Sequence, residues 1–394
     1  MGANELLADL AGVGRSPNGG YTRLSWDAAT MELREWFVAQ AEALGLAVTE
    51  DGNGNQLAWW GSGPDALLLG SHLDSVPSGG PLDGPLGVTS AFAAIAALRG
   101  SGWRPGRPIA VANFTDEEGG RFGVACLGSR LATGAIAPET ALGLRDADGY
   151  SLAEVMSARG HDPHLAGPVG WLAECQYYIE LHVEQGRWLG PAGAAVGVAS
   201  AIWPHGRYRL DFCGQGNHAG ATAMADRHDP MLAYAATMLA ARELATVSGQ
   251  RATLGRVQVE PNSTNSIPSR VTAWLDARAS AEPELESLVA GIIARAEAAA
   301  TAEGATVEVR AESVTGAVEF DLELRHRLAQ LLDAPVLPTG AGHDAGILAA
   351  KLPTAMLFVR NPTGVSHAPE EHAAPEDIDA GVAALTRVVQ EVAG

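Results

Sequence analysis

The segment Gly70–Gly87, directly after the apolar run Ala66–Leu69, contains a histidine and two aspartates. The run is short and bounded, as expected of a buried strand, so the chain leaves a sheet and presents His72. Asp74 follows two residues later, and Asp83 lies in the glycine- and proline-rich loop beyond it. Ligands gather at the carboxyl ends of strands in open α/β sheets, and imidazole and carboxylate groups suit divalent transition metals. The stretch alone leaves two interpretations open, a metal site or a hydrogen-bonded surface pair.

A second acidic group, Asp116-Glu117-Glu118, follows the apolar run Ile109–Phe114. Adjacent glutamates at a strand end point in different directions, so one can bind a metal while its neighbour faces a bound water. Metal-assisted hydrolysis needs that division of labour between a ligand and a general base. A solvated acidic turn is the alternative interpretation of this triplet.

Two further histidines accompany strand-like runs, His182 within Tyr177–Val183 and His367 in the loop after Thr354–Val359. Each has an ordinary alternative interpretation, a core histidine in the first case and a surface loop histidine in the second. The combination is stronger than its members, because five groups would lie at the carboxyl ends of strands in one sheet: His72, Asp83, Glu118, His182 and His367. Such a set can hold two divalent ions roughly 3.5–4 Å apart, with Asp83 bridging them.

Strand-like runs alternate with long helical patterns around these motifs. Residues 25–44 are predicted to form an amphipathic helix that Ser25 caps. The runs 46–49 and 56–60 flank Asp-Gly and Asn-Gly turns, which is typical of a hairpin. The alternation predicts an α/β domain with a mostly parallel sheet flanked by helices.

From about Trp203 the order of elements becomes strand, helix, strand, strand, helix, strand. This is the split βαβ (ferredoxin-like) arrangement of a small two-layer α+β domain. The α/β pattern then resumes, so the small domain interrupts the larger one. We therefore expect a metal-binding catalytic domain at 1–203 and 315–394 and an inserted domain at 204–314.

Composition narrows the class of protein. The chain has 394 residues, which favours two domains, and a net charge of −20, which argues against binding to nucleic acid or anionic membranes. The apolar run Val88–Leu98 is too short to cross a bilayer, and the first residues carry no basic segment typical of a signal peptide. The three scattered cysteines fit a reducing compartment, so we expect a cytoplasmic location.

These residues resemble the peptidase M20 family, and within it the branch of N-carbamoyl-L-amino acid hydrolases, allantoate amidohydrolases and β-ureidopropionases. The resemblance covers nearly the whole chain and rests on the segments GSHLDSVPSGGPLDGPLGV, DEEGGRF with LGSR, ELHVEQG, GNHAGATAM, PNSTNSIPSRV, GAGHDA and GVSHAPEE. The peptidase branch usually has an acidic ligand where ELHVEQG supplies His182. The histidine therefore favours the ureide and carbamoyl hydrolases over the peptidases.

The resemblance implies two ligand sets for divalent ions: His72, Asp83 and His182 for one, and Asp83, Glu118 and His367 for the other. It implies that Glu117 is the general base, which activates the bridging water and delivers its proton to the leaving nitrogen. Asp74 would orient the ring of His72, a common support for metal-bound imidazoles. Ligands of this kind do not discriminate sharply among Mn, Co, Ni and Zn.

The inserted domain resembles a lid that also forms a homodimer. Its His218 matches the family's histidine that reaches into the partner subunit's site and stabilises the tetrahedral oxyanion. Arg278 matches the carboxylate-binding arginine, and a planar bidentate donor suits that role in so acidic a protein, although a surface ion pair is the alternative. The other expected substrate contacts are Gln185, Asn265, Gly342 and His343.

The predicted reaction is hydrolysis of the C–N bond of an N-carbamoyl (ureido) group on an L-amino acid, which yields the amino acid, ammonia and carbon dioxide. Allantoate, or an N-acyl or N-formyl amino acid, is the alternative substrate. A dipeptidase is disfavoured by His182, and a binding protein without catalysis is disfavoured by the complete ligand set and base. Pro81-Leu82 and Trp203-Pro204-His205 depart from the family's pattern and leave the substrate open.

Overall fold

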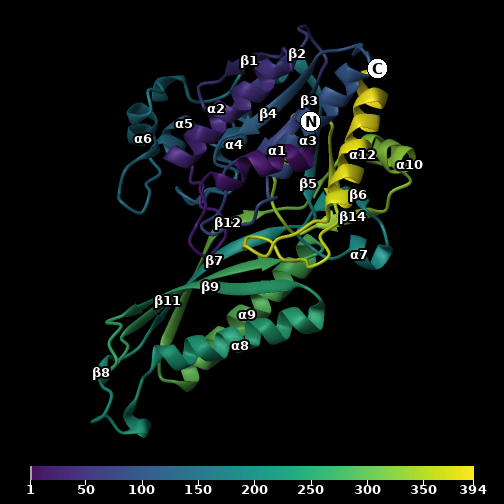
Figure 1. Ribbon diagram of the computed structural model, residues 1–394. Helices are drawn as coiled ribbons and strands as arrows, with labels where there is room; N and C mark the ends of the chain where they lie inside the picture. The colour runs from purple at the N-terminus through teal and green to yellow at the C-terminus, as the bar shows by residue number, and fades with distance from the viewer. Residues whose placement is uncertain (1) are drawn as a thin grey trace. The chain divides into compact units, whose positions relative to one another are not determined.

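The computed structural model describes residues 2–394, which form two compact units. Unit 1 comprises the chain up to Ala201 together with Glu319–Gly394, and unit 2 comprises Ile202–Val318. The second unit is thus an insertion in the first. Figure 1 follows the chain through both units by colour.

A nine-stranded sheet, in the order β1-β2-β4-β3-β5-β15-β6-β13 with β14 paired to β6, forms the centre of unit 1. Its four central strands, β4, β3, β5 and β15, are parallel, whereas the pairs β1–β2, β2–β4 and β15–β6 are antiparallel. This confirms the predicted α/β class with a largely parallel sheet. The strands are β1 (Ala47–Glu50), β2 (Gln56–Trp60), β3 (Ala66–His72), β4 (Ile109–Phe114), β5 (Cys175–Val183), β6 (Val196–Ile202), β13 (Val318–Glu319), β14 (Val336–Thr339) and β15 (Thr354–Val359).

Helix α3 (Pro85–Gly100) is buried along most of its length and packs on β3, β5 and the C-terminal helix α12 (Pro375–Ala393). It is apolar on every side, which is typical of a helix enclosed by other elements. Gly84, with φ of 87°, precedes it, and Pro85 occupies its first turn, where a missing N–H costs nothing. The main core therefore lies between this sheet face and the helices α1, α3 and α12.

Helix α2 (Ala28–Ala43) begins later than predicted, and Ser25 does not cap it. The side chain of Asp27 accepts the hydrogen bond of the Thr30 amide at 2.8 Å instead. Trp26 between them has φ of 64°, so the chain bends away before the helix starts. The prediction was wrong because the sequence alone does not reveal that left-handed residue.

The remaining helices of unit 1 are short. They are α1 (Ala3–Asp9), α4 (Leu127–Thr133), α5 (Pro138–Leu142), α6 (Leu152–Ala158), α7 (Leu189–Ala192), α10 (Leu322–Leu332), α11 (Asp344–Leu348) and the 3₁₀ turns Leu10–Gly12, Pro163–Leu165 and Trp171–Glu174. Helices α4, α5 and α6 surround a small separate apolar cluster that includes Leu131 and Met156.

Unit 2 is a four-stranded antiparallel sheet, in the order β12-β7-β11-β9, with the helices α8 and α9 packed together and against it. Leu210, Phe212, Leu275 and Ile292 belong to its own core. Its elements are β7 (His205–Cys213), β8 (Asn217–His218), the 3₁₀ turn Met224–Asp226, α8 (Pro230–Ser248), β9 (Arg251–Glu260), β10 (Ser266–Ile267), β11 (Arg270–Arg278), α9 (Glu282–Ala302) and β12 (Thr306–Thr315).

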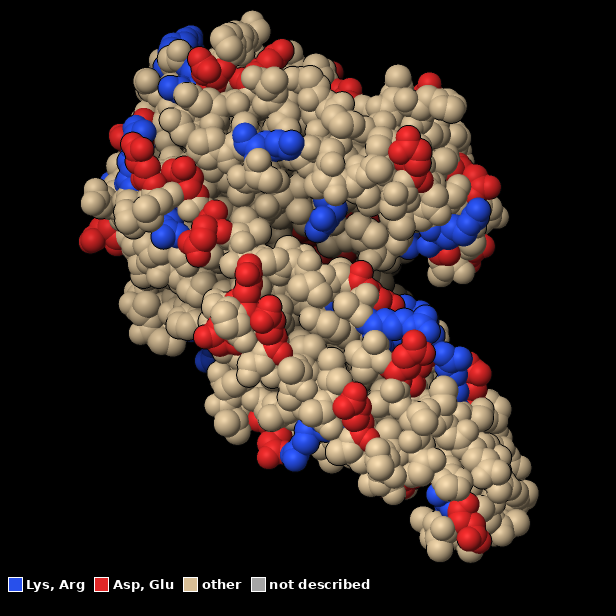
Figure 2. All heavy atoms as spheres, turned by 180° about the vertical axis from the view of Figure 1, so that it is seen from behind, with Lys and Arg blue, Asp and Glu red and all other residues tan. Residues whose placement is uncertain are grey.

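The face of the molecule drawn in Figure 2 carries its charge in small groups. Figure 2 shows acidic and basic side chains interspersed over the face that it draws, with the basic ones in separate small clusters. Among the helices of residues 2–394, none combines the length and the apolar character that a membrane crossing requires.

A glycine in β3 provides a test of the packing between the central strands. Gly70 has φ of 135°, and a Cβ atom there would overlap the backbone of Ala112 in β4. We expect Gly70→Ala to destabilise the protein by roughly 2–5 kcal/mol, because it adds both backbone strain and a steric overlap. The thermal unfolding midpoint, followed by circular dichroism, measures this change.

Gly100→Ala is the matched control, because Gly100 ends α3 and a Cβ atom there would meet only open space within 4 Å. It should change stability by less than about 1 kcal/mol. Equal midpoints for the two variants would contradict the argument.

Candidate metal centre

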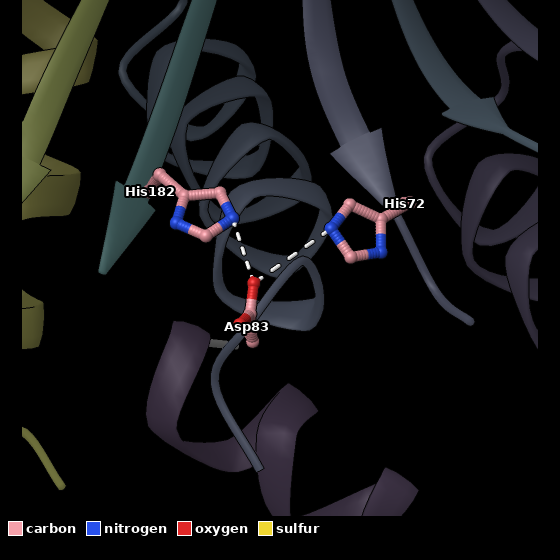
Figure 3. A group of neighbouring side chains, drawn as sticks. All are labelled: His72, Asp83 and His182. Atoms are coloured by element: carbon pink, nitrogen blue, oxygen red, sulfur yellow. Dashed lines mark ion pairs between the residues drawn. The ribbon is translucent and has the colours of Figure 1, made fainter. Parts of the chain in front are cut away.

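Asp83 lies between imidazoles on both sides of its carboxylate. Its Oδ1 is 3.2 Å from Nε2 of His182 and 3.9 Å from Nε2 of His72 (Figure 3). Its Oδ2 is 3.2 Å from Nε2 of His367, which is also 3.3 Å from Oε2 of Glu118. One carboxylate therefore faces two separate groups of ligand atoms.

Three parallel strands place most of these side chains at one edge of the sheet. His72 ends β3, His182 is next to the last residue of β5, and Glu118 follows β4 by four residues. Carboxyl ends of parallel strands meet at the same edge, which is why residues distant in sequence converge here. His367 comes from the loop between β15 and α12.

Gly84 allows Asp83 and His72 to approach each other. A Cβ atom on Gly84 would overlap the imidazole of His72, and the residue has φ of 87°. Only glycine meets both conditions without strain. The N-terminus of α3 therefore comes directly under the His72 ring.

The unpaired atoms of this site fit divalent metal ions. Among the described residues, buried Nε2 atoms of His72 and His182 and Oε1 of Glu118 have no hydrogen-bond partner. Leaving such atoms unpaired is costly unless another group, such as a cation, satisfies them. Within residues 2–394, three groups of side chains bring possible ligand atoms within 4.8 Å of one another. They are His72/Asp83/His182, Asp83/Glu118/His367 and Glu180/His182/His343. The first two consist of the same residues as the ligand sets that the family resemblance implied.

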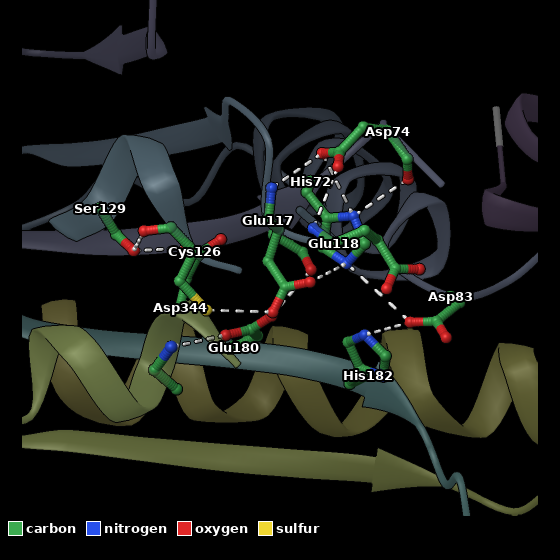
Figure 4. Close-up of polar contacts among 12 residues, drawn as sticks. His72, Asp74, Asp83, Glu117, Glu118, Cys126, Ser129, Glu180, His182 and Asp344 are labelled. Carbon is green, nitrogen blue, oxygen red and sulfur yellow. Dashed lines mark hydrogen bonds and ion pairs between the residues drawn. The ribbon is translucent and has the colours of Figure 1, made fainter. Parts of the chain in front are cut away.

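The carboxylate of Asp74 binds the backbone amides of the two glutamates more closely than it approaches the ring of His72. Its two carboxylate oxygens accept hydrogen bonds from the amides of Glu117 and Glu118, at 3.2 and 3.1 Å (Figure 4). The His72 Nδ1 atom lies 3.1 Å from the backbone oxygen of Asp74 and 3.6 Å from its carboxylate. Asp74 thus orients both the His72 ring and the turn that carries the two glutamates.

Glu117 is buried, 5% exposed, and lies between His72 and Cys126. Its Oε2 lies 3.5 Å from Nε2 of His72, and its Oε1 accepts from Sγ of Cys126 at 3.4 Å (Figure 4). Burial, followed by the charges of Asp344 and Glu118, raises the pKa of Glu117 well above its usual value. This carboxyl group therefore has a high affinity for a proton.

The other shifts show how strongly the imidazoles and carboxylates interact. Burial opposes the charged form of Asp83, but the imidazoles of His182 and His367, whose Nε2 atoms each lie 3.2 Å from its carboxylate, hold its pKa well below the usual value. Burial would lower the pKa of His182, yet Asp83 raises it to about 9. Contacts with Asp83 and Glu118 raise the pKa of His367 to about 11.

Buried acids surround the site: the sequence placed Asp344 near it, next to His343 in the segment GAGHDA, but sequence reasoning missed Glu180. Glu180 accepts from Ser71 at 2.8 Å and from the Ala345 amide at 3.1 Å, and Asp344 accepts from Ser129 at 2.5 Å. Burial raises the pKa of Asp344 well above its usual value. The available signal was an acidic residue inside an otherwise apolar strand, as Glu180 is in Tyr178-Ile179-Glu180-Leu181.

The substrate contacts expected in unit 1 lie beside the ligands. Gln185 donates to Oδ2 of Asp83 at 2.9 Å, and its own Oε1 is buried without a partner. His343 is buried, its ring centroid is 4.5 Å from that of His182, and its Nε2 has no partner. Gly342, next to it, is exposed, and a Cβ atom there would meet nothing within 4 Å.

The other three expected contacts lie in unit 2, at two ends of it. His218 pairs with Ser266 between β8 and β10, and the Ala219 amide donates to the backbone oxygen of Asn265. Arg278 ends β11, roughly 27 Å along the strand from Arg270 at a rise of about 3.4 Å per residue. Because β10 directly precedes Arg270, His218 and Asn265 are far from Arg278 within one chain.

Arg278 is half of a local ion pair. Its Nε and Nη2 donate to the two carboxylate oxygens of Asp276 at 2.8 and 3.2 Å. His205, one of the residues that depart from the family's pattern, lies opposite Arg278 in the β7–β11 register. Burial, and then the charge of Arg278, lowers the pKa of His205.

Comparison with known proteins confirms the family resemblance of the sequence. The sequence profile of peptidase family M20/M25/M40 matches residues 68–391. The N-carbamoyl-L-amino acid amidohydrolase of Geobacillus stearothermophilus is 38% identical over 98% of this chain and 97% of its own length. The allantoate amidohydrolase of Escherichia coli (strain K12) is 31% identical over 99% of this chain and 97% of its own length.

Solved structures give the same result for the fold. The crystal structure of an amidase of the hydantoinase/carbamoylase family from Burkholderia vietnamiensis superposes with a TM-score of 0.91. The two sequences are 30% identical, and the match covers 99% of this chain and 96% of the other.

The pKa shifts predict how the stability of the metal-free protein depends on pH. Burial raises the pKa of Asp74 from 3.8 to about 7, and Asp83 raises that of His182 from 6.5 to about 9. The folded state then binds more protons than the unfolded state between each pair of values, so stability falls as pH rises through both windows. The unfolding midpoint in EDTA should therefore decrease from about pH 5 to about pH 9, by the equivalent of a few kcal/mol.

Excess Mn²⁺ should reduce this decrease, because bound cations replace the protons that the carboxylates otherwise require. Asp74→Asn should flatten the part of the profile below pH 7. A midpoint in EDTA that stays constant or rises with pH would contradict the electrostatic account.

Proposed function

This chain belongs to peptidase family M20/M25/M40, and from that membership and the site around Asp83 we propose that it is a metal-dependent amidohydrolase. Its substrate is the N-carbamoyl (ureido) group of an L-amino acid, and hydrolysis of the C–N bond releases the amino acid, ammonia and carbon dioxide. The observation that carries the proposal is the carboxylate of Asp83 between two groups of ligand atoms, with the buried Glu117 beside them. Similarity to an N-carbamoyl-L-amino acid amidohydrolase and an allantoate amidohydrolase supports the class of bond that is cleaved.

Two divalent ions, Mn, Co, Ni or Zn, would occupy the sets His72/Asp83/His182 and Asp83/Glu118/His367. When bound, such ions polarise the carbonyl oxygen of the substrate and lower the pKa of water. The unpaired imidazole nitrogens and the Glu118 oxygen support this assignment. His182 supports the ureide branch over the peptidases.

Glu117 is the general base in this proposal. It takes a proton from the attacking water and later gives it to the leaving nitrogen. A carboxyl group that burial makes more basic is suited to hold that proton between the two steps. The Cys126 thiol at 3.4 Å and the backbone bonds to Asp74 limit the movement of Glu117.

His218 stabilises the oxyanion of the tetrahedral intermediate. Its Nδ1 accepts hydrogen bonds from the amides of Gly220 and Ala221, both at 3.1 Å, so in the neutral ring the proton lies on Nε2. The side chain is exposed, which leaves that N–H available to an incoming oxygen.

The chain works as a homodimer in which unit 2 is both lid and dimerisation domain. Arg278 binds the substrate carboxylate, and Asp276 orients its guanidinium for that contact. A ureido amino acid cannot span the roughly 27 Å of strand that separates Arg278 from the end of unit 2 with His218 and Asn265. We therefore assign these last two residues to the site of the partner subunit and Arg278 to its own.

Gln185, His343 and Gly342 complete the substrate contacts from unit 1. The unpaired Oε1 of Gln185 and Nε2 of His343 are buried next to the ligands and can bond the ureido or carboxylate group. Allantoate is the second candidate substrate, because it also carries ureido groups beside a carboxylate and a relative of that name covers the whole chain. N-acyl or N-formyl amino acids come after it.

The first test measures ammonia and free amine released from N-carbamoyl-L-amino acids, allantoate, and N-acyl and N-formyl amino acids by Mn²⁺-loaded protein. Glu117→Gln should lower kcat by roughly 10²- to 10⁴-fold on the best substrate, because it removes the base. The variant should keep its metal, which elemental analysis checks.

Glu118→Gln is the control, since it should lose metal as well as activity. The substrate with the highest kcat/KM identifies the subfamily. Protein that binds two ions but releases neither ammonia nor amine from the ureido substrates would contradict the proposed reaction.

The shared site predicts complementation between two inactive variants. Glu117→Gln and His218→Ala, mixed under conditions that allow subunits to exchange, should regain about a quarter of wild-type activity. Half of the dimers are then mixed, and one of the two sites in each has both intact residues. Each variant alone, treated in the same way, should stay inactive, and a mixture that stays inactive despite confirmed exchange would contradict the contribution of the partner subunit.

A further inference from the structure

One proposed ligand is held differently from the rest. The side chains of His72, Asp83, Glu118 and His182 are at most 6% exposed, whereas that of His367 is 49% exposed. His367 also has φ of 55°, a left-handed conformation that a non-glycine residue adopts only when its surroundings require it. Packing therefore does not hold this side chain in place, and its loop must do so.

Glu371 connects that loop to the loop of Asp83. Its Oε2 accepts hydrogen bonds from the amides of Leu82 and Asp83 at 2.8 and 3.0 Å. Its Oε1 is 2.7 Å from Oγ of Ser366, which is also 3.0 Å from Oδ2 of Asp83. The side chain of Glu371 thus binds both Ser366, which precedes His367, and the backbone of Asp83, whose carboxylate His367 faces.

The surroundings of Glu371 are built for this contact. The residue is 4% exposed, and a Cβ atom on Gly80 would overlap its carboxylate. At the other end of the loop, the Asn361 side chain bonds the amides of Thr363 and Gly364 and the backbone oxygen of Val365. The loop that carries His367 is therefore held by the hydrogen bonds of Asn361 at its start and by those between Glu371 and the Asp83 loop at its end.

We propose that Glu371 is the positioning residue that sets the separation of His367 from Asp83, and thereby allows the Asp83/Glu118/His367 set to hold its ion. This rests on the dinuclear site of the proposed function. The His72/Asp83/His182 set depends on it less, because both of its histidines belong to buried strands. Loss of Glu371 should then weaken one ion selectively.

The test is a Mn²⁺ titration of the whole protein by equilibrium dialysis and elemental analysis. Glu371→Ala should bind one ion per chain at a free Mn²⁺ concentration where wild type binds two, with the affinity of the other ion lowered roughly 10- to 100-fold. Glu370→Ala is the matched control, because Glu370 is the exposed neighbour. It should bind Mn²⁺ as wild type does.

Glu371→Gln separates positioning from general destabilisation. Its amide oxygen still accepts from the two amides and its NH₂ group can donate to Ser366, so it should restore the second ion. Circular dichroism of the EDTA-treated variants verifies that each is folded.

Three results would overturn the inference alone: two ions in Glu371→Ala with wild-type affinities, parallel loss of both ions, or a Glu371→Gln variant no better than Glu371→Ala. Wild-type protein that binds no Mn²⁺ would overturn the dinuclear site and this inference together.

Discussion

Burial of several carboxyl groups in and around the strands β3, β4 and β5 is the constraint on which the rest of unit 1 depends. Asp74, Asp83, Glu117, Glu180 and Asp344 are each at most 5% exposed. Ionised carboxylates in such surroundings repel one another and lack hydration, which is costly unless positive charge or donors compensate. The imidazoles next to Asp83 supply part of that compensation. The raised pKa of Glu117 reflects the burial and carboxylate repulsion that they leave uncompensated. Bound cations could satisfy the remaining atoms, which is the basis of the proposed metal site.

Backbone geometry adapts the loops around this charge. Gly84 lets the start of α3 pass under the His72 ring, and Asp74 holds the turn with the two glutamates by their amides. The side chain of Glu371 likewise holds the loop before α3 by accepting hydrogen bonds from the amides of Leu82 and Asp83. Acidic side chains thus serve in two ways, as candidate ligands and as acceptors that hold loop backbone in place.

The two units contribute different groups to the proposed site. Every candidate metal ligand and the candidate base belong to unit 1, whereas His218, Asn265 and Arg278 belong to unit 2. The length of β11 keeps Arg278 far from His218 and Asn265, which is the reason for the proposal that the last two residues act in the site of a partner subunit. The departures at Trp203-Pro204-His205 adjoin Arg278 through the β7–β11 register, and Leu82 of the other departure bonds Glu371. Both are positions from which substrate preference can change without loss of a ligand.

The sequence by itself predicted the α/β class, the strands at Ile109–Phe114 and Thr354–Val359, and the residues that meet around Asp83. Those follow from local patterns, because apolar runs define buried strands and the carboxyl ends of parallel strands share one edge. Tertiary structure alone decided the cap at Asp27, the place of the buried Glu180 beside the site, and the link from Glu371 to Asp83 across 288 positions. These depend on left-handed residues such as Trp26 and on contacts between segments distant in sequence, which no local pattern encodes.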